Sequence, residues 1–138
     1  MRHLYLLIFL FMIAACSGSG NKQEKKTEEP FQYLYDKVMD IHDEVMPRMD
    51  EIQKIKRQLQ EKLKNSKDLA EEKRKELEQK IALLDSASRA MMNWMHEYHP
   101  EYYEGDSLRI YLENEVERVT RVKELMLDAI KKGSEDGQ

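Results

Sequence analysis

The sequence predicts an all-α protein: an antiparallel up-down-up three-helix bundle that follows a cleaved leader and a disordered tether. Apolar residues recur at every third or fourth position over three long stretches, which is the period of an amphipathic helix. None of the 5 glycines lies between Asn21 and Glu104, which excludes the frequent turns of a β-sandwich or a β-barrel. The connections between the stretches are short, so consecutive helices should be antiparallel neighbours. A length of 138 residues allows one domain.

Residues 1–15 are predicted to be a lipoprotein signal peptide. The positively charged Arg2 is followed by an unbroken apolar run over residues 4–15. This run is too short to span a hydrocarbon core of ~30 Å, which needs about 20 residues, but it has the length of a secretory h-region. Residues 13–16, Ile-Ala-Ala-Cys, resemble the lipobox of bacterial lipoproteins, in which signal peptidase II cuts before the cysteine and that cysteine is lipidated.

Cys16 is therefore the predicted lipidation site, and residues 16–30 are predicted to be a flexible, charged linker. Cys16 is the only cysteine, so it has no disulfide partner. A palmitate-bearing lipid anchor would hold the protein stably at a membrane. Ser17 is not an inner-membrane retention signal of the Asp type, so we expect the outer membrane, with a periplasmic or a surface-facing orientation left open. The alternative is an ordinary cleaved signal with Cys16 as a bystander.

The first helix is predicted over about residues 31–64. Its apolar seam consists of Phe31, Leu34, Val38, Ile41, Val45, Met49, Ile52, Ile55, Leu59 and Leu63. Pro47 lacks a backbone N–H and should kink the helix, which would resume at Arg48. Two abutting helices are the less favoured alternative, because no Ser, Thr or Asn directly precedes Pro47 as a cap.

The second and third helices are predicted over about residues 68–98 and 106–132. Asp68 and Glu71 have the spacing of a capping box, and the second helix should stop before Pro100. Asp106 is the expected N-cap of the third helix, and Gly133 is its expected C′ residue. Residues 134–138 would then form a disordered tail. The two seams are Leu77, Ile81, Leu84, Ala87, Met91, Trp94, Met95 and Tyr98, and then Leu108, Tyr111, Leu112, Val116, Val119, Val122, Met126 and Ile130.

Methionine and histidine gather in two windows, residues 39–49 and residues 91–99. If the hairpin turn centres near Ser66, residue i of the first helix faces about residue 133 − i of the second, and both windows meet at the end of the bundle away from the hairpin. One interpretation is that the methionines only pack around Trp94 and the Pro47 kink. The other is a soft thioether and imidazole site for copper. Its candidate ligands are Met39, His42, Met46, Met92, Met95, His96 and His99.

Other function classes find little support in the sequence. A net charge of −4 provides no basic stripe for nucleic acid. His96 and His99 are three positions apart, whereas the histidines of a zinc-protease helix are four apart, and no Glu-x-x-His motif of di-iron bundles is present. The only cysteine is the predicted anchor, so a nucleophilic catalytic arrangement is not credible. We therefore expect that the protein is not an enzyme and that it has no cofactor, with copper as the alternative.

Two segments carry a resemblance to a known group of proteins. Residues 35–47 (YDKVMDIHDEVMP) and residues 88–95, which include the run MMNWM, look like segments of small lipoproteins of Gram-negative bacteria that are often labelled viral A-type inclusion protein-like. The resemblance carries no catalytic residues and implies that the two segments belong together. We expect a membrane-anchored, non-enzymatic helical module that binds a protein partner or acts structurally in the envelope. Tyr102 and Tyr103 are candidate contact residues, although a turn packed on the bundle is the favoured interpretation for them. The alternative is a periplasmic copper-binding lipoprotein.

Overall fold

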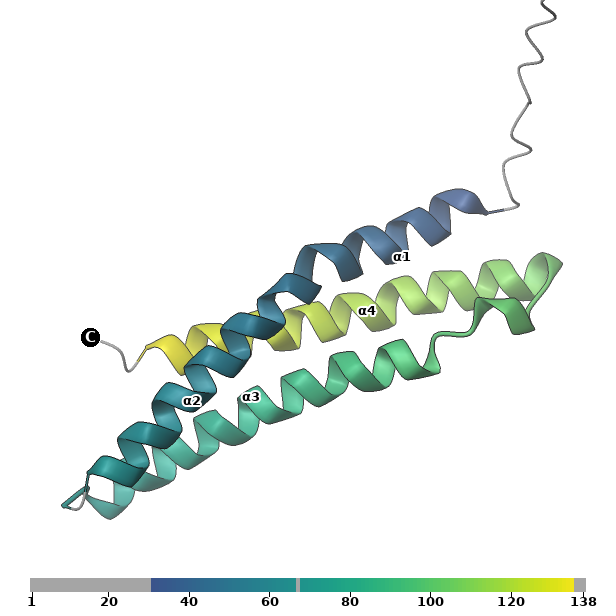
Figure 1. The fold of residues 1–138 in the computed structure, drawn as a ribbon. Helices are drawn as coiled ribbons and strands as arrows, with labels where there is room; N and C mark the ends of the chain where they lie inside the picture. Colours follow the sequence, from purple (N-terminus) through teal and green to yellow (C-terminus); the bar gives the residue numbers. More distant parts are fainter. Residues whose placement is uncertain (1–30, 67, 136–138) are drawn as a thin grey trace, which may run out of the picture.

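The computed structural model describes residues 31–66 and 68–135, and within these ranges the protein is helical with no strand. The elements are α1 (Gln32–Val45), the 3-10 turn η1 (Met46–Arg48), α2 (Met49–Asn65), α3 (Glu71–Glu97), the 3-10 turn η2 (Pro100–Tyr102) and α4 (Gly105–Ser134). With α1 and α2 counted as one broken helix, the predicted all-α three-helix bundle is confirmed (Figure 1). The predicted signal peptide, the lipidation site Cys16, the linker and the last three tail residues lie outside the described residues.

The first helix breaks at Pro47, as its missing N–H predicts. The Met46 N–H still closes α1 onto the His42 carbonyl, and the Met49 N–H then bonds to the Met46 carbonyl in a 3-10 turn. The regular helix therefore resumes at Met49, one residue later than predicted. The break changes the neighbours of the chain: α1 lies beside α4, whereas α2 lies against both α3 and α4 (Figure 1). In the described part of the chain, no helix is long and apolar enough to cross a membrane.

The hairpin between α2 and α3 turns later than predicted. The helix α3 begins at Glu71 after Ala70, which offers no side-chain cap, so the predicted capping box of Asp68 and Glu71 is wrong. Lys56 Nζ donates to Asp85 Oδ1 at 2.6 Å, and Gln53 Nε2 donates to Ser88 Oγ at 3.3 Å. Residue i of α2 thus faces about residue 141 − i of α3, a displacement of eight residues from the predicted register. The two pairs are symmetric about a point about four residues beyond Ser66, and α3 begins only at Glu71.

Both predicted caps of the last helix are also wrong. Glu104, and not Asp106, is the N-cap of α4: its N–H donates to Ser107 Oγ at 3.3 Å, and its side chain accepts a bond from the Ser107 N–H. At the other end, Gly133 continues the helix and is buried. A Cβ atom at Gly133 would lie 2.8 Å from Ile55 Cγ2 and 3.3 Å from Leu84 Cδ1. This glycine lets α2, α3 and α4 approach one another closely, which is a packing role and not a chain-ending one.

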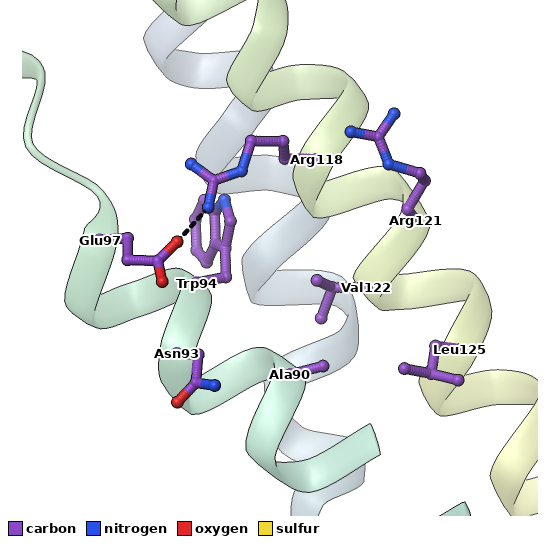
Figure 2. Close-up of a pocket in the computed structure, with 8 residues that line it drawn as sticks. All are labelled: Ala90, Asn93, Trp94, Glu97, Arg118, Arg121, Val122 and Leu125. Atoms are coloured by element: carbon purple, nitrogen blue, oxygen red, sulfur yellow. Dashed lines mark hydrogen bonds and ion pairs between the residues drawn. The ribbon is translucent and has the colours of Figure 1, made fainter. Parts of the chain in front are cut away.

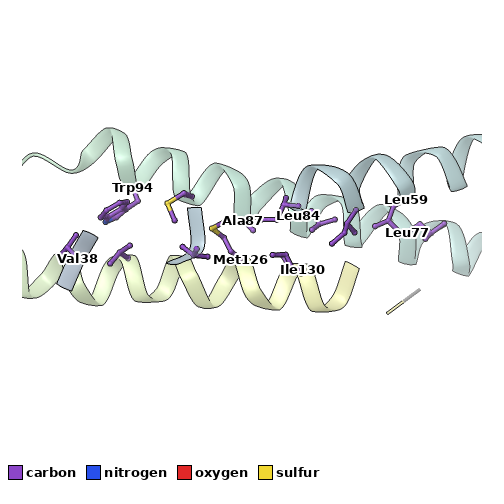
Figure 3. Packing of buried hydrophobic residues seen from close by; sticks show 14 residues of the cluster. Val38, Leu59, Leu77, Leu84, Ala87, Trp94, Met126 and Ile130 are labelled. Atoms are coloured by element: carbon purple, nitrogen blue, oxygen red, sulfur yellow. The ribbon is translucent and has the colours of Figure 1, made fainter. Parts of the chain in front are cut away.

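The core runs along the inside of the bundle (Figure 3). Its buried members come from all four α-helices, and all but Ala129 belong to the predicted seams. They are Val38, Val45, Ile52, Ile55, Leu59, Leu77, Leu84, Ala87, Met91, Trp94, Val119, Met126, Ala129 and Ile130. On the outside, Lys123 Nζ of α4 lies 2.6 Å from Glu44 Oε2 of α1. The two helices start at the same end of the bundle and run parallel (Figure 1), as an up-down-up topology requires.

Candidate functional site

A column of stacked rings crosses the bundle from α1 to the turn before α4, and we call it the aromatic column. It consists of His42, Trp94, Tyr98, Tyr111 and Tyr103. Successive ring centroids lie 5.7, 5.2, 6.2 and 4.2 Å apart. The Trp94–Tyr98 and Tyr98–Tyr111 separations are those of favourable aromatic pairs, each worth about 0.5–1.5 kcal/mol beyond the burial of area, and Tyr103 stacks closer still on Tyr111. The column therefore ties α1, α3, α4 and the chain around η2 into one body.

A buried carboxylate stands beside the column. Glu115 of α4 is only 2% exposed and is the one buried charged residue among those that the structure describes. Trp94 Nε1 donates to its Oε2 at 2.8 Å, and Arg118 Nη1 donates to its Oε1 at 2.7 Å. The second terminal nitrogen of Arg118 donates to Glu97 of α3. Burial opposes the charge of this guanidinium, but its bonds to Glu115 and Glu97 outweigh burial and raise the pKa of Arg118.

The hydroxyl groups of the column differ in how they are satisfied. Tyr111 Oη accepts a bond from the His99 N–H at 2.8 Å, which fixes the chain where α3 has ended. Tyr98 Oη is buried and has no hydrogen-bond partner among the described residues. Burial raises the pKa of Tyr98 to about 12, helped by the neighbouring Tyr35, Tyr111 and Glu115. Tyr98 is thus held as a neutral phenol, and the arrangement favours rigid packing over proton transfer.

A hollow of about 300 Å³ lies between α3 and α4, beside Trp94 (Figure 2). Its wall is apolar at Ala90, Val122 and Leu125, while Glu97 and Arg118 close one side. Figure 2 shows the ion pair between these two residues spanning from one helix to the other. Because the Arg118 guanidinium already bonds to two carboxylates, it is committed to holding the helices together. Arg121 also lines the hollow, and its Nη1 lies 3.7 Å from Glu117 Oε2 in an exposed pair.

The methionines and histidines of the two windows are divided between the core and the surface. Met91 is fully buried, and Met46, Met49 and Met95 pack against the core from its edge. Met39 and Met92 are 39% and 51% exposed. This division supports packing for the inner residues, as their helical spacing suggested.

The histidines are engaged separately. The His42 ring lies against Trp94, one helical turn from the predicted neighbour Met91, and its Nδ1 lies 2.8 Å from Asp43 Oδ1. His99 stacks on Tyr102, and its Nδ1 lies 2.8 Å from Glu101 Oε1, whereas His96 is exposed. Within residues 31–66 and 68–135, no group of three His, Cys, Asp or Glu side chains could hold a metal ion. These side chains do not include the thioether sulfurs of methionine, so the copper site stays a prediction.

Sequence reasoning missed Glu115 and Arg118, although the sequence contains a signal for both. Leu112, Glu115 and Val119 share the helical period of the core, so a carboxylate occupies a position that faces inward. Arg118 follows three residues later, at the spacing of an ion pair along a helix. An acid at a core position with a base one turn away predicts a buried, paired charge. What the sequence does not reveal is the third partner, the Trp94 indole from another helix.

The turn end of the bundle, where α1 begins and α3 leads into α4, carries four of the seven large apolar side chains that are exposed in the described chain. We define this turn end by those residues: Tyr33, Tyr102, Tyr103 and Ile110. Tyr102 is 74% exposed although its ring lies 5.1 Å from that of His99, and Tyr103 is 39% exposed although it stacks on Tyr111. The rings are therefore held in place by their neighbours and still face solvent.

Comparison of the chain with protein-family models, with curated proteins and with solved structures finds no match.

Proposed function

We propose that this protein is a lipid-anchored, non-enzymatic helical module of the bacterial envelope that binds a protein partner through its turn end. The observation that carries the proposal is the exposure of Tyr102 at 74% on a chain segment that stacking immobilises. Exposed aromatic residues that are already ordered are typical anchors of protein interfaces, because little side-chain entropy is lost on binding. The proposed anchor at Cys16 rests on the lipobox resemblance of residues 13–16.

The interior of the bundle supports a binding role in place of catalysis. The buried Glu115 carboxylate bonds to the Trp94 indole and to the partly exposed Arg118, and Tyr98 is kept neutral by burial. Groups that are satisfied by their neighbours stabilise one arrangement of the helices and leave none of these side chains poised to act on a substrate.

The test of the anchor uses the full chain in its own cells. A Cys16→Ala variant should lose labelling by a radioactive fatty acid and leave the membrane fraction or accumulate unprocessed. A Ser17→Ala variant is the matched control and should be labelled like the wild type. Continued labelling or membrane fractionation of Cys16→Ala would overturn the anchor.

The test of the interface is site-specific photo-cross-linking in the same cells. A photoreactive amino acid at Tyr102 should give a discrete adduct whose second component mass spectrometry identifies as one protein. The control position is Arg57, which is exposed on α2 away from the turn end. Equal adducts from both positions, or none from Tyr102, would refute the proposed interface.

A further inference from the structure

We infer that the turn end recognises an arginine-rich segment of a protein partner. This inference rests on the proposed binding function and deepens it by naming the chemistry of the partner. Tyr102 is 74% and Tyr33 is 63% exposed, and both offer aromatic surface at one end of the bundle. The electron-rich face of a tyrosine attracts a cation, and the planar guanidinium of arginine stacks on it better than the ammonium of lysine.

The charges of the turn end select the sign of the partner. Residues 98–113 carry four carboxylates, Glu101, Glu104, Asp106 and Glu113, and a single basic residue, Arg109. Arg109 is occupied, since its Nη1 donates to both carboxylate oxygens of Glu113 at 3.0 and 3.1 Å. Glu101, in the η2 turn, is exposed, and its Oε1 lies 2.8 Å from His99 Nδ1. With four carboxylates and one arginine, residues 98–113 have an excess of negative charge, and a cationic segment would meet it next to aromatic faces.

The same charges disfavour a lipid surface as the occupant of the turn end. Tyrosine is common at membrane interfaces, but the bilayer surface that carries anionic lipids repels carboxylates. A membrane-seated end would be expected to carry Lys or Arg near its tyrosines, and Arg109 is the only such residue in residues 98–113. Charge complementarity thus favours a basic protein segment over the bilayer.

The probes are two fluorescent peptides, hexa-arginine and hexa-lysine, titrated against the full lipidated chain in non-ionic detergent at ~50 mM salt and followed by anisotropy. Hexa-arginine should bind more tightly than hexa-lysine. Tyr102→Ala should weaken hexa-arginine about three-fold, which is the effect of one exposed cation–π contact, and leave hexa-lysine nearly unchanged. The pair Glu101→Gln plus Asp106→Asn should weaken both peptides, whereas the control pair Glu61→Gln plus Glu78→Gln, which removes the same charge elsewhere on α2 and α3, should not.

Equal binding of the two peptides with no effect of Tyr102→Ala would overturn the inference, as would equal effects of the two charge pairs. A second arm tests the bilayer: in vesicles made with brominated lipid, a Tyr102→Trp variant should show no quenching beyond that of Trp94 in the wild type. Added quenching would place the turn end on the lipid and overturn the inference. If the peptides fail while cross-linking from Tyr102 succeeds, the partner chemistry is wrong and the binding function stands; if both fail, both are wrong.

Discussion

The first prediction concerns how much the ion pair between the buried Glu115 and Arg118 stabilises the fold. In Arg118→Met the Glu115 carboxylate stays 2% exposed and loses its cationic partner. In Glu115→Leu the Trp94 indole N–H loses its acceptor, while Arg118 keeps Glu97. In the double variant, no buried charge is left at the site and a single indole N–H is unpaired. The two single substitutions therefore leave different groups unsatisfied.

The expected loss in the free energy of unfolding depends on which buried group each substitution leaves without a partner. Breaking a fully buried ion pair by removing one partner costs about 3–5 kcal/mol, and because the Arg118 side chain is 35% exposed we expect about 2–3 kcal/mol for Arg118→Met. An unsatisfied buried N–H costs about 1–3 kcal/mol, so we expect about 1–2 kcal/mol for Glu115→Leu. The double variant should cost no more than Glu115→Leu alone and should be more stable than Arg118→Met.

The assay is urea unfolding followed by circular dichroism and by the fluorescence of Trp94, the single tryptophan of the chain, which contacts the altered site directly. The control is Arg121→Met, because Arg121 lies 3.7 Å from Glu117 in an exposed pair that should be worth less than about 1 kcal/mol. Additive costs in the double variant would show that Glu115 and Arg118 do not interact in the folded protein, and the reasoning would be refuted.

Four further predictions follow from single features. Tyr98→Phe should leave stability unchanged or raise it by up to about 1 kcal/mol in urea unfolding, because the buried hydroxyl has no partner among the described residues; a loss above 1 kcal/mol would reveal a bond. The pKa of Tyr98 is raised to about 12 in the folded state, so the free energy of unfolding that depends on its neutral form is complete below pH 10 and is lost as the pH rises from 10 to 12. Over that range, the melting temperature of the wild type should fall more steeply than that of Tyr98→Phe. Gly133→Ala should destabilise the protein by about 1 kcal/mol, because overpacking of about 1–3 kcal/mol against Ile55 exceeds the gain in helix propensity. The control Ser134→Ala, at the exposed neighbouring position, should not destabilise it. A Gly133→Ala variant that is more stable than the wild type would contradict the close contact. Anaerobic Cu(I) competition should give an affinity no tighter than that of a generic Met/His peptide, because Met46 and Met95 pack against the core; tight binding that His42→Ala plus Met95→Leu abolishes would favour the copper alternative.

The apolar seams of the bundle could be predicted because the helical period alone indicates which side chains of a helix face the core. Val38, Ile52, Leu84 and Val119 all lie where the helical period places them, and the break at Pro47 follows from a missing N–H. The ends of the helices were predicted less accurately than the seams. Glu104 is the N-cap of α4 in place of the expected Asp106, and it pairs with Ser107; spacing does not decide between the two acidic neighbours.

The candidate site was less accessible to sequence reasoning because its contacts join different helices. The aromatic column needs His42 from α1 and Tyr111 from α4, and a hairpin register displaced by eight residues is enough to misplace such pairs. Gly133 illustrates the same limit: its role depends on Ile55 and Leu84, which are distant in the sequence. Tyr102 could be named as a candidate contact, but its stacking on His99 and its exposure of 74% were not evident from the sequence.

The parallel pairing of α1 with α4 has a consequence for the order in which the chain can fold. Glu44 and Lys123 are 79 residues apart in the sequence, whereas Lys56 and Asp85 of the hairpin are only 29 apart. As the protein emerges from the ribosome with its N-terminus first, α2 and α3 can close on each other while α1, whose main neighbour is α4, must wait. The apolar positions Leu34 and Val38 therefore stay uncovered until almost the whole chain has been made. During that interval α1 is the segment that a chaperone would need to shield.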